Sequence, residues 1–254
     1  MADNNPNSLI AKFRDAEKKT RETFRHGNFD EAITNNVFFL YAGSTVASNN
    51  FPKVIQQLYS HPEVLAKVRA ELASLDHSNV TVNDLERKDG APCRIPYTEA
   101  AILEALRLTP TFGPTLPRVV PPIGCQLNDY FIPPGYEVGM SGWTVNYDKS
   151  YFGEDAAEYK PERWLGNHPT ELAKDGSGKS RTMRNYLEAG WFTFGAGARV
   201  CVGKNMTMIG FAKAVAALTR EFELEIVEEP YFWYSLIVHA EGMMVRIKKR
   251  AVTT

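Results

Sequence analysis

One cysteine near the C-terminal end stands in a glycine-rich turn, and its setting suggests chemistry. Cys201 lies within FTFGAGARVCVGKN (192–205), two residues after Arg199 and at the start of an apolar segment that favours a helix. A cysteine acts as a nucleophile or metal ligand only as the thiolate, and a nearby cation and a helix N-terminus both favour that form. The setting therefore predicts a reactive or metal-binding thiol. The alternative is a structural cysteine buried in a glycine turn.

Glycines in such a turn could instead cradle a phosphate, but the spacing excludes the two common phosphate loops. A dinucleotide fingerprint beginning at Gly195 and Gly197 needs its third glycine where the chain has Val200. A phosphate loop of the G-x-x-x-x-G-K-[ST] type needs a glycine and a hydroxyl where Ala198 and Asn205 stand. Both nucleotide-binding interpretations fail.

The whole turn resembles the cysteine-ligand loop of the cytochrome P-450 superfamily. The matching positions are Phe194, Gly195, Gly197, Arg199, Cys201 and Gly203. The resemblance implies a haem b (heme b) whose iron is bound by the Cys201 thiolate, with Phe194 against the sulfur and Arg199 paired with a haem propionate. It also implies that Gly195 and Gly203 let backbone N–H groups turn toward the sulfur and let the loop lie flat under the macrocycle.

Further charged residues match motifs of the same family in the same order. Glu104 and Arg107 lie three residues apart in EALR, which puts both on one face of a helix, although such pairs are also common on solvated faces. PERW (161–164) resembles the family's P-E-R-F box, whose arginine meets that pair. The resemblance implies a buried triad in which Glu104 is shared by Arg107 and Arg163. It also implies that Arg118, in LPRVV, binds a propionate; the alternative is a surface cation on a strand.

The family's long distal helix corresponds to about 30–60, and its centre departs from the usual motif. The family usually has small-Gly-x-acid-Thr, whereas the chain has AGSTVA, with Ala42 and Gly43 in place. Thr45 then stands where the acid is expected and Val46 where the hydroxyl is expected. A shift of one residue would make Thr45 the hydroxyl, so Gly43 and Thr45 are the candidate catalytic residues, and the acid is lost.

The sequence pattern predicts a mainly α fold with small β-sheets (α+β), similar to the C-terminal, haem-binding half of the cytochrome P-450 fold. The expected elements are helices over about 30–60, 62–75, 97–109 and 203–222, strands with at least one hairpin over 111–147, an irregular segment over 148–190, and the cysteine loop over 192–203. Pro52 should kink or end the first helix. We expect 1–254 to be one truncated haem domain, because the chain begins just before the distal helix, and a second polypeptide could supply the other half.

Composition excludes several other classes of protein. The 254 residues carry a formal net charge of −1, so no general affinity for nucleic acid or anionic lipid is expected. Three cysteines, Cys93, Cys125 and Cys201, do not make a disulfide framework and indicate a reducing compartment or a ligand cysteine. The N-terminus has no signal peptide and the longest apolar run is too short to span a bilayer. We expect a soluble, cytoplasmic chain, although the resembled family's microsomal members are bound to the endoplasmic-reticulum membrane.

The resemblance implies an oxidoreductase, a haem-dependent monooxygenase of secondary metabolism or detoxification. Such an enzyme receives electrons from an NADPH-dependent flavoprotein reductase and inserts one oxygen atom of O2 into a small apolar organic substrate. A haem-thiolate isomerase or cyclase, which needs no proton delivery to oxygen, is a variant. A non-catalytic haem-binding fragment is the alternative from another class. We expect the enzyme because the cysteine loop, the Glu/Arg pair and PERW are all present.

Overall fold

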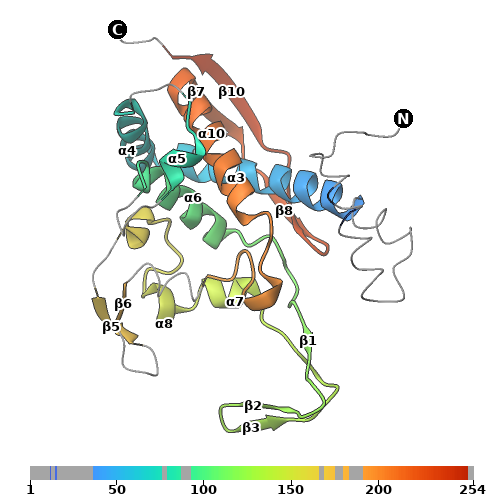
Figure 1. Cartoon of the computed structure of the whole chain (residues 1–254). Helices are drawn as coiled ribbons and strands as arrows, with labels where there is room; N and C mark the ends of the chain where they lie inside the picture. Colours follow the sequence, from blue (N-terminus) through green and yellow to red (C-terminus); the bar gives the residue numbers. More distant parts are fainter. Residues whose placement is uncertain are drawn as a thin grey trace. The chain divides into compact units, whose positions relative to one another are not determined.

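The computed structural model describes residues 12, 15, 37–75, 79–86, 93–165, 169–174, 180–182 and 191–250. The chain divides into two compact units, Met1–Ser48 and Asn49–Thr254. The start of the expected distal helix, 30–36, lies outside the described residues. Nearly all described elements belong to the second unit (Figure 1).

Four long helices supply the core of the second unit. They are α3 (Ala47–Ser60), α4 (Pro62–Ala73), α6 (Pro96–Leu108) and α10 (Lys204–Glu221). The first two residues of α3 belong to the first unit. Prolines open α4 and α6, where the missing N–H costs nothing because the first turn has no partner for it. Short turns connect them: α5 (Val82–Leu85), α7 (Gly142–Asn146), α8 (Lys149–Phe152) and the 3-10 turns η2 (Pro161–Trp164) and η3 (Gly197–Arg199).

Helix α6 is the centre of the core. Every residue from Thr98 to Leu108 is buried, as expected for a helix that neighbours cover on all sides. Helices α4 and α10 pack against it and against each other (Figure 1). Apolar side chains with almost no exposed surface fill the space: Val54, Leu58, Val68, Leu72, Ile102, Leu106, Ala212 and Val215.

The N-terminus of α6 is capped by a carboxylate from another helix. Glu71 of α4 accepts the backbone N–H of Tyr97 on Oε1 and that of Thr98 on Oε2, each at 2.7 Å, and the Thr98 hydroxyl at 2.6 Å. These N–H groups have no partner within α6, and the negative charge suits the positive end of the helix. Glu71 therefore fixes the start of the helix that carries Glu104 and Arg107.

We expect Glu71→Ala to lower the free energy of unfolding by about 1–2 kcal/mol, the usual cost of losing a cap. Urea unfolding of the chain measures this loss. The matched control is Glu63→Ala, an exposed position on the same helix, where the change should stay within about 0.5 kcal/mol. Equal losses in the two variants would show that the cap contributes nothing.

Each strand that the structure describes pairs with one other strand, and every such pair is antiparallel. The pairs are β1 (Arg118–Val119) with β4 (Glu137–Val138), β2 (Cys125–Leu127) with β3 (Tyr130–Ile132), β5 (Pro169–Lys174) with β6 (Ser180–Thr182), β7 (Phe222–Glu228) with β10 (Met244–Lys249), and β8 (Tyr231–Tyr234) with β9 (Val238–Glu241). The hairpin expected within 111–147 is present and turns at Asn128-Asp129, with Asn128 at φ +49° in the left-handed region that asparagine tolerates.

Two expectations about the elements were wrong, and a third was wrong in part. Helix α3 continues through Pro52 instead of ending there, because its buried face (Asn50, Val54, Ile55, Leu58) holds it in the core although one backbone hydrogen bond is lost. The segment around Trp143, expected to be a strand, forms helix α7, whose last residue is the fully buried Asn146. The segment 148–190, expected to be irregular, contains α8, η2 and the β5–β6 hairpin.

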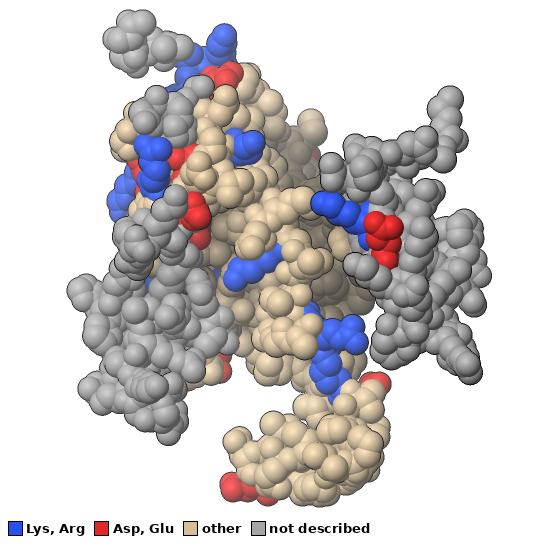
Figure 2. Space-filling view, in the orientation of Figure 1, with Lys and Arg blue, Asp and Glu red and all other residues tan. Residues whose placement is uncertain are grey.

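Within the described residues no helix is both long enough and apolar enough to cross a membrane. On the face drawn in Figure 2, basic and acidic side chains of the described residues are interspersed, in keeping with the net charge of −1.

Candidate functional site

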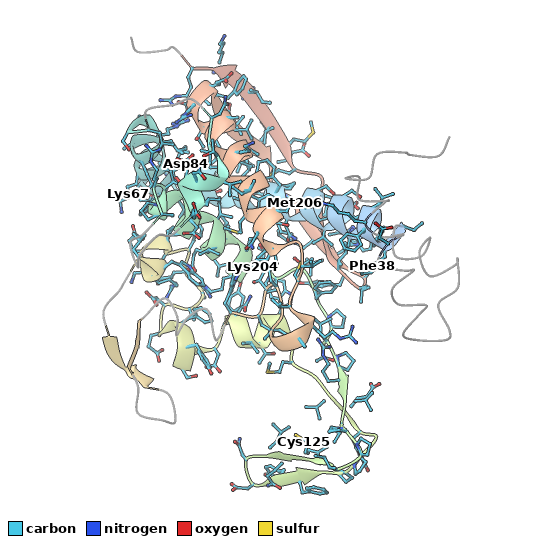
Figure 3. The ribbon with its side chains drawn as sticks, in the orientation of Figure 1. Phe38, Lys67, Asp84, Cys125, Lys204 and Met206 are labelled. Carbon is cyan, nitrogen blue, oxygen red and sulfur yellow. The ribbon has the colours of Figure 1, made fainter. Side chains whose placement is uncertain are left out.

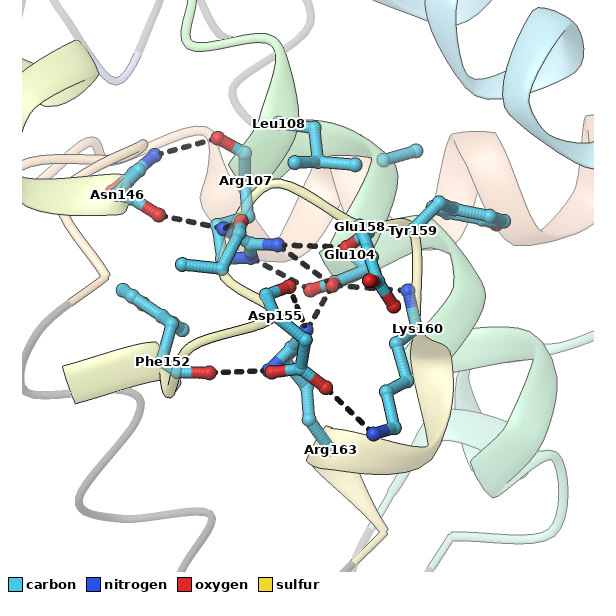
Figure 4. Close-up of polar contacts among 12 residues, drawn as sticks. Glu104, Arg107, Leu108, Asn146, Phe152, Asp155, Glu158, Tyr159, Lys160 and Arg163 are labelled. Atoms are coloured by element: carbon cyan, nitrogen blue, oxygen red, sulfur yellow. Dashed lines mark hydrogen bonds and ion pairs between the residues drawn. The ribbon is translucent and has the colours of Figure 1, made fainter. Parts of the chain in front are cut away.

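A buried ionic cluster centred on Glu104 joins two distant motifs (Figure 4). Arg107 donates from Nε to Glu104 Oε2 and from Nη2 to Oε1, both at 2.8 Å, and Arg163 donates from Nε to Oε1 at 2.7 Å. Glu104 and Arg107 are fully buried, and the side chain of Arg163 is 7% exposed. The structure thus brings the glutamate and arginine of EALR together with the arginine of PERW.

The same carboxylate has further donors, so no lone pair is left bare in the core. Trp164 donates from its indole Nε1 to Glu104 Oε2 at 2.8 Å, and the backbone N–H of Lys160 donates to Oε1 at 3.2 Å. A buried charge is stable only when it is paired and hydrogen-bonded in this way.

The two arginines also hold the segment 146–158 against α6. Arg107 donates from Nη1 to the carbonyls of Asn146 and Ala156, both at 2.6 Å. Arg163 donates to the Phe152 carbonyl at 2.6 Å and to the Asp155 carbonyl at 3.0 Å. The hydrogen bond from Lys160, with help from Arg163, lowers the pKa of the Asp155 carboxyl. The cluster therefore acts as a clamp on the segment that leads to PERW.

Asn146 extends the clamp to the start of the cysteine loop. Its Nδ2 donates to the Arg107 carbonyl at 3.1 Å and to Thr193 Oγ1 at 2.9 Å, and its Oδ1 accepts the Phe192 N–H at 2.9 Å. Sequence analysis missed this residue. The available signal was a lone amide in the otherwise apolar stretch GWTVN, which suggests a buried polar group with partners.

The cysteine loop itself is closed by backbone hydrogen bonds. The Cys201 N–H donates to the Phe194 carbonyl at 2.8 Å, and the Gly195 N–H donates to the Phe192 carbonyl at 3.1 Å. Gly195 and Gly197 have φ of +71° and +66°, a region that favours glycine. The backbone conformation of the loop therefore requires glycine at both positions.

The residues of the loop fit a metal-bearing, anionic, planar group. The Cys201 side chain is exposed, which rules out the buried structural cysteine considered above. It lies three residues before the first residue of α10, an 18-residue helix with no side-chain cap at its N-terminus, whose positive end favours a thiolate. Next to it, a Cβ at Gly203 would lie 3.7 Å from the Cys201 sulfur, which is an ordinary van der Waals contact. A lone soft thiolate suits haem iron.

The candidate propionate-binding arginines are both exposed. Arg199 is the last residue of η3 and lies two residues before the cysteine. Arg118 lies on β1, and its Nη1 donates to the carbonyls of Leu116 and Pro117 at 3.3 and 2.9 Å. Exposed guanidinium groups are available to carboxylates of a ligand.

The other two cysteines have different settings. Cys93 is buried, and its sulfur donates to Glu99 Oε2 at 3.3 Å. Cys125 lies on the β2–β3 hairpin (Figure 3).

The candidate catalytic residues Gly43 and Thr45 lie in the first unit, within the π-helical turn η1 (Ala42–Val46). The π-helical turn thus falls on the stretch where the sequence departs from the family motif. Hydroxyls of this region bond to local carbonyls: Ser44 Oγ to Leu40 at 2.6 Å and Ser48 Oγ to Thr45 at 3.0 Å. Turns of this kind occur often at functional sites.

Comparison with known proteins decides the family, because the family model described as cytochrome P-450 matches residues 1–251. The chain belongs to the cytochrome P-450 family. The cytochrome P-450 monooxygenase pkfB of Emericella nidulans is 38% identical over 214 residues, which are 82% of this chain and 38% of that protein. Pisatin demethylase of Fusarium vanettenii is 35% identical over 192 residues, 76% of this chain and 34% of that protein. The chain therefore spans well under half of the length of these curated relatives.

Solved cytochrome P-450 structures have the same fold. The cytochrome P450DA heme domain aligns with a TM-score of 0.62 at 20% identity, over 81% of this chain and 41% of that one. A second cytochrome P-450 aligns with a TM-score of 0.60 at 24% identity, over 84% of this chain and 44% of that one. The expected α+β cytochrome P-450 fold is confirmed.

Proposed function

We propose that this chain is the haem-binding part of a cytochrome P-450 monooxygenase and that the Cys201 thiolate is its axial ligand. One observation carries the proposal: an exposed thiol at the uncapped N-terminus of a long helix, in a loop closed through two glycines with positive φ. Helix dipole and cation together favour the thiolate that iron binds. When bound, a thiolate-ligated haem supplies electron-rich iron that favours O–O cleavage.

The chain's own residues would bind and orient this group. Arg199 and Arg118 would pair with the propionates, since a guanidinium fork matches a carboxylate. Phe194 would exclude water from the sulfur side. Gly195 and Gly203 would leave room for the macrocycle. The Glu104 cluster would hold the cysteine loop in place without contacting the haem.

We infer that the substrate is a small apolar organic molecule and that electrons come from an NADPH-dependent flavoprotein reductase. Support comes from relatives named as monooxygenases and as a pisatin demethylase. Secondary metabolism is the setting that these fungal relatives favour.

We expect Cys201→Ser to abolish the thiolate-type Soret band of the haem-reconstituted chain, because an alcohol is not deprotonated at neutral pH. Absorption spectra after titration with haem measure this. Cys93→Ser and Cys125→Ser are the matched controls and should keep the band. A thiolate-type band in the Cys201 variant would overturn the ligand assignment.

The turn η1 favours a second candidate, an isomerase or cyclase that never cleaves oxygen. It offers the Thr45 hydroxyl but no carboxylate, and valine at 46 cannot donate or accept a hydrogen bond. The residues of η1 would therefore offer a hydroxyl but no acid for moving a proton.

We expect Thr45→Asp combined with Val46→Thr to raise product formed per reducing equivalent, on the order of 10²-fold, which is the lower end of general acid–base contributions. The measurement is coupled turnover with a reductase and a parallel peroxide assay. Val46→Thr alone is the control and should raise the product formed per reducing equivalent by less than the double variant does. No gain in the double variant would favour the isomerase or cyclase, whereas tight coupling in the unaltered protein would mean that this helix is misaligned with the family motif.

A further inference from the structure

Aromatic rings connect the Glu104 cluster to the cysteine loop. Trp164, which donates to Glu104, lies edge-on to Trp191 with 5.6 Å between ring centroids. Trp191 lies edge-on to Phe194 in turn, at 5.3 Å. The two tryptophans are 1% and 5% exposed, so these contacts are made inside the core. Edge-to-face pairs at this separation are favourable and have a fixed geometry.

Trp191 contacts the cysteine loop on both sides of Cys201. On the N-terminal side, Phe194 packs on its ring, and the carbonyl of the same Phe194 accepts the Cys201 N–H at 2.8 Å. On the C-terminal side, the Nζ of Lys204, the first residue of α10, lies 5.3 Å from the Trp191 ring centroid (Lys204 is labelled in Figure 3). Such a cation–π contact is attractive.

The indole N–H of Trp191 does not explain why a tryptophan stands at this position. Among the buried side-chain polar atoms of the described residues, only the Nε1 atoms of Trp143 and Trp191 have no hydrogen-bond partner. A buried donor without a partner is unfavourable. The favourable part of Trp191 is therefore its ring, which touches Trp164, Phe194 and Lys204.

We propose that Trp191 is a positioning residue that fixes both sides of the Cys201 loop to the Glu104 cluster through Trp164. The effect of Trp191 on a haem ligand rests on the proposed function. Its packing connection between the Glu104 cluster and the loop, called the mechanical link below, does not. Neither tryptophan had a role in the sequence analysis, because only the folded chain brings Trp164, Trp191 and Phe194 into contact.

The link is tested on the haem-free chain by amide hydrogen exchange at the Cys201 N–H, the donor that closes the loop. Trp191→Leu should accelerate this exchange about tenfold or more, because the loop then opens locally. Trp143→Leu is the matched control: it also removes a tryptophan with a partnerless N–H, but one whose ring contacts are Tyr147 and Tyr234. It should leave the Cys201 amide within about twofold of the unaltered chain.

Trp191→Phe keeps an aromatic ring and removes the partnerless N–H, so it should protect the Cys201 amide nearly as well as tryptophan does. Where Trp191→Leu does not fold, Trp191→Met replaces it in the comparison. Unchanged exchange in Trp191→Leu, or equal acceleration in Trp191→Leu and Trp143→Leu, would overturn the proposal.

A second arm uses the haem-reconstituted chain. Trp191→Leu should lower the fraction of thiolate-type Soret absorption and shift the reduction potential, and Trp191→Phe should restore both. If the unaltered chain binds no haem while the exchange results hold, the proposed function fails and the mechanical link stands. If haem binds normally and exchange does not respond to Trp191, the link fails and the proposed function stands.

Discussion

Glu104→Ala is expected to leave little soluble, haem-loaded protein. The substitution removes one carboxylate and strands two buried guanidinium groups, Arg107 and Arg163, inside the core. Breaking a buried ion pair from one side costs about 3–5 kcal/mol. A domain of this kind has only about 5–15 kcal/mol of stability in total. Soluble yield, haem content and urea unfolding measure the loss.

The control for this prediction is Glu225→Ala on strand β7. Glu225 pairs with Arg246 across the β7–β10 sheet, and both side chains are more than half exposed. A solvated pair contributes about 0–1 kcal/mol, so this variant should behave like the unaltered chain. Similar losses at the two positions would mean that the Glu104 cluster contributes no more than a surface pair.

The second large effect concerns Lys53, a fully buried lysine on α3. Its Nζ donates to Asn50 Oδ1 at 3.3 Å and to the Val238 carbonyl at 3.2 Å. No carboxylate of the described residues forms a salt bridge with it. Burial without a countercharge lowers the pKa of Lys53 from 10.5 to about 8.

A pKa that is lower in the folded chain makes folding favour the neutral amine. Stability should therefore be lowest below about pH 8, where the buried amine is charged, and should rise between about pH 8 and the unfolded value of 10.5. The full rise is about 3 kcal/mol. Lys53→Met removes the titrating group, so the stability of the variant relative to the unaltered chain should fall by about that amount as the pH rises and should change sign, from more stable to less stable.

Urea unfolding at about pH 7 and about pH 10 measures this difference. At about pH 7 the variant should gain on the order of 1 kcal/mol, because removal of the buried charge outweighs the two lost hydrogen bonds. Lys213→Met, on the exposed face of α10, is the matched control and should show no such pH dependence. If the free energy of unfolding of both variants, relative to the unaltered chain, changed with pH in the same way, the lowered pKa of Lys53 would be contradicted.

Most of the fold and part of the site could be predicted from the sequence. Prolines and glycines in sequence fix where α4, α6 and α10 begin, and the three-residue spacing of Glu104 and Arg107 fixes their common face. The course of α3 through Pro52 could not be predicted, because burial of its neighbours decides it. Trp191 was missed because its connection to Glu104 runs through Trp164, which is distant in the sequence. Asn146 was missed although its amide was a signal.

The ligand roles of Cys201, Arg199 and Arg118 and the catalytic roles of Gly43 and Thr45 stay predictions. For Gly43 and Thr45 the local turn is known, and the double variant described above tests their chemistry. For Cys201 the loop geometry fits the role, and only a spectrum of the bound iron reports ligation itself.

The carbon monoxide difference spectrum of the reduced, haem-reconstituted chain tests the central claim most directly, because it reports haem binding and thiolate ligation together. A Soret maximum at the wavelength typical of thiolate-ligated haem, lost in Cys201→Ser and kept in Cys93→Ser, is the predicted result. A maximum typical of a neutral axial ligand in freshly reconstituted protein, or no bound haem at all, would contradict the account.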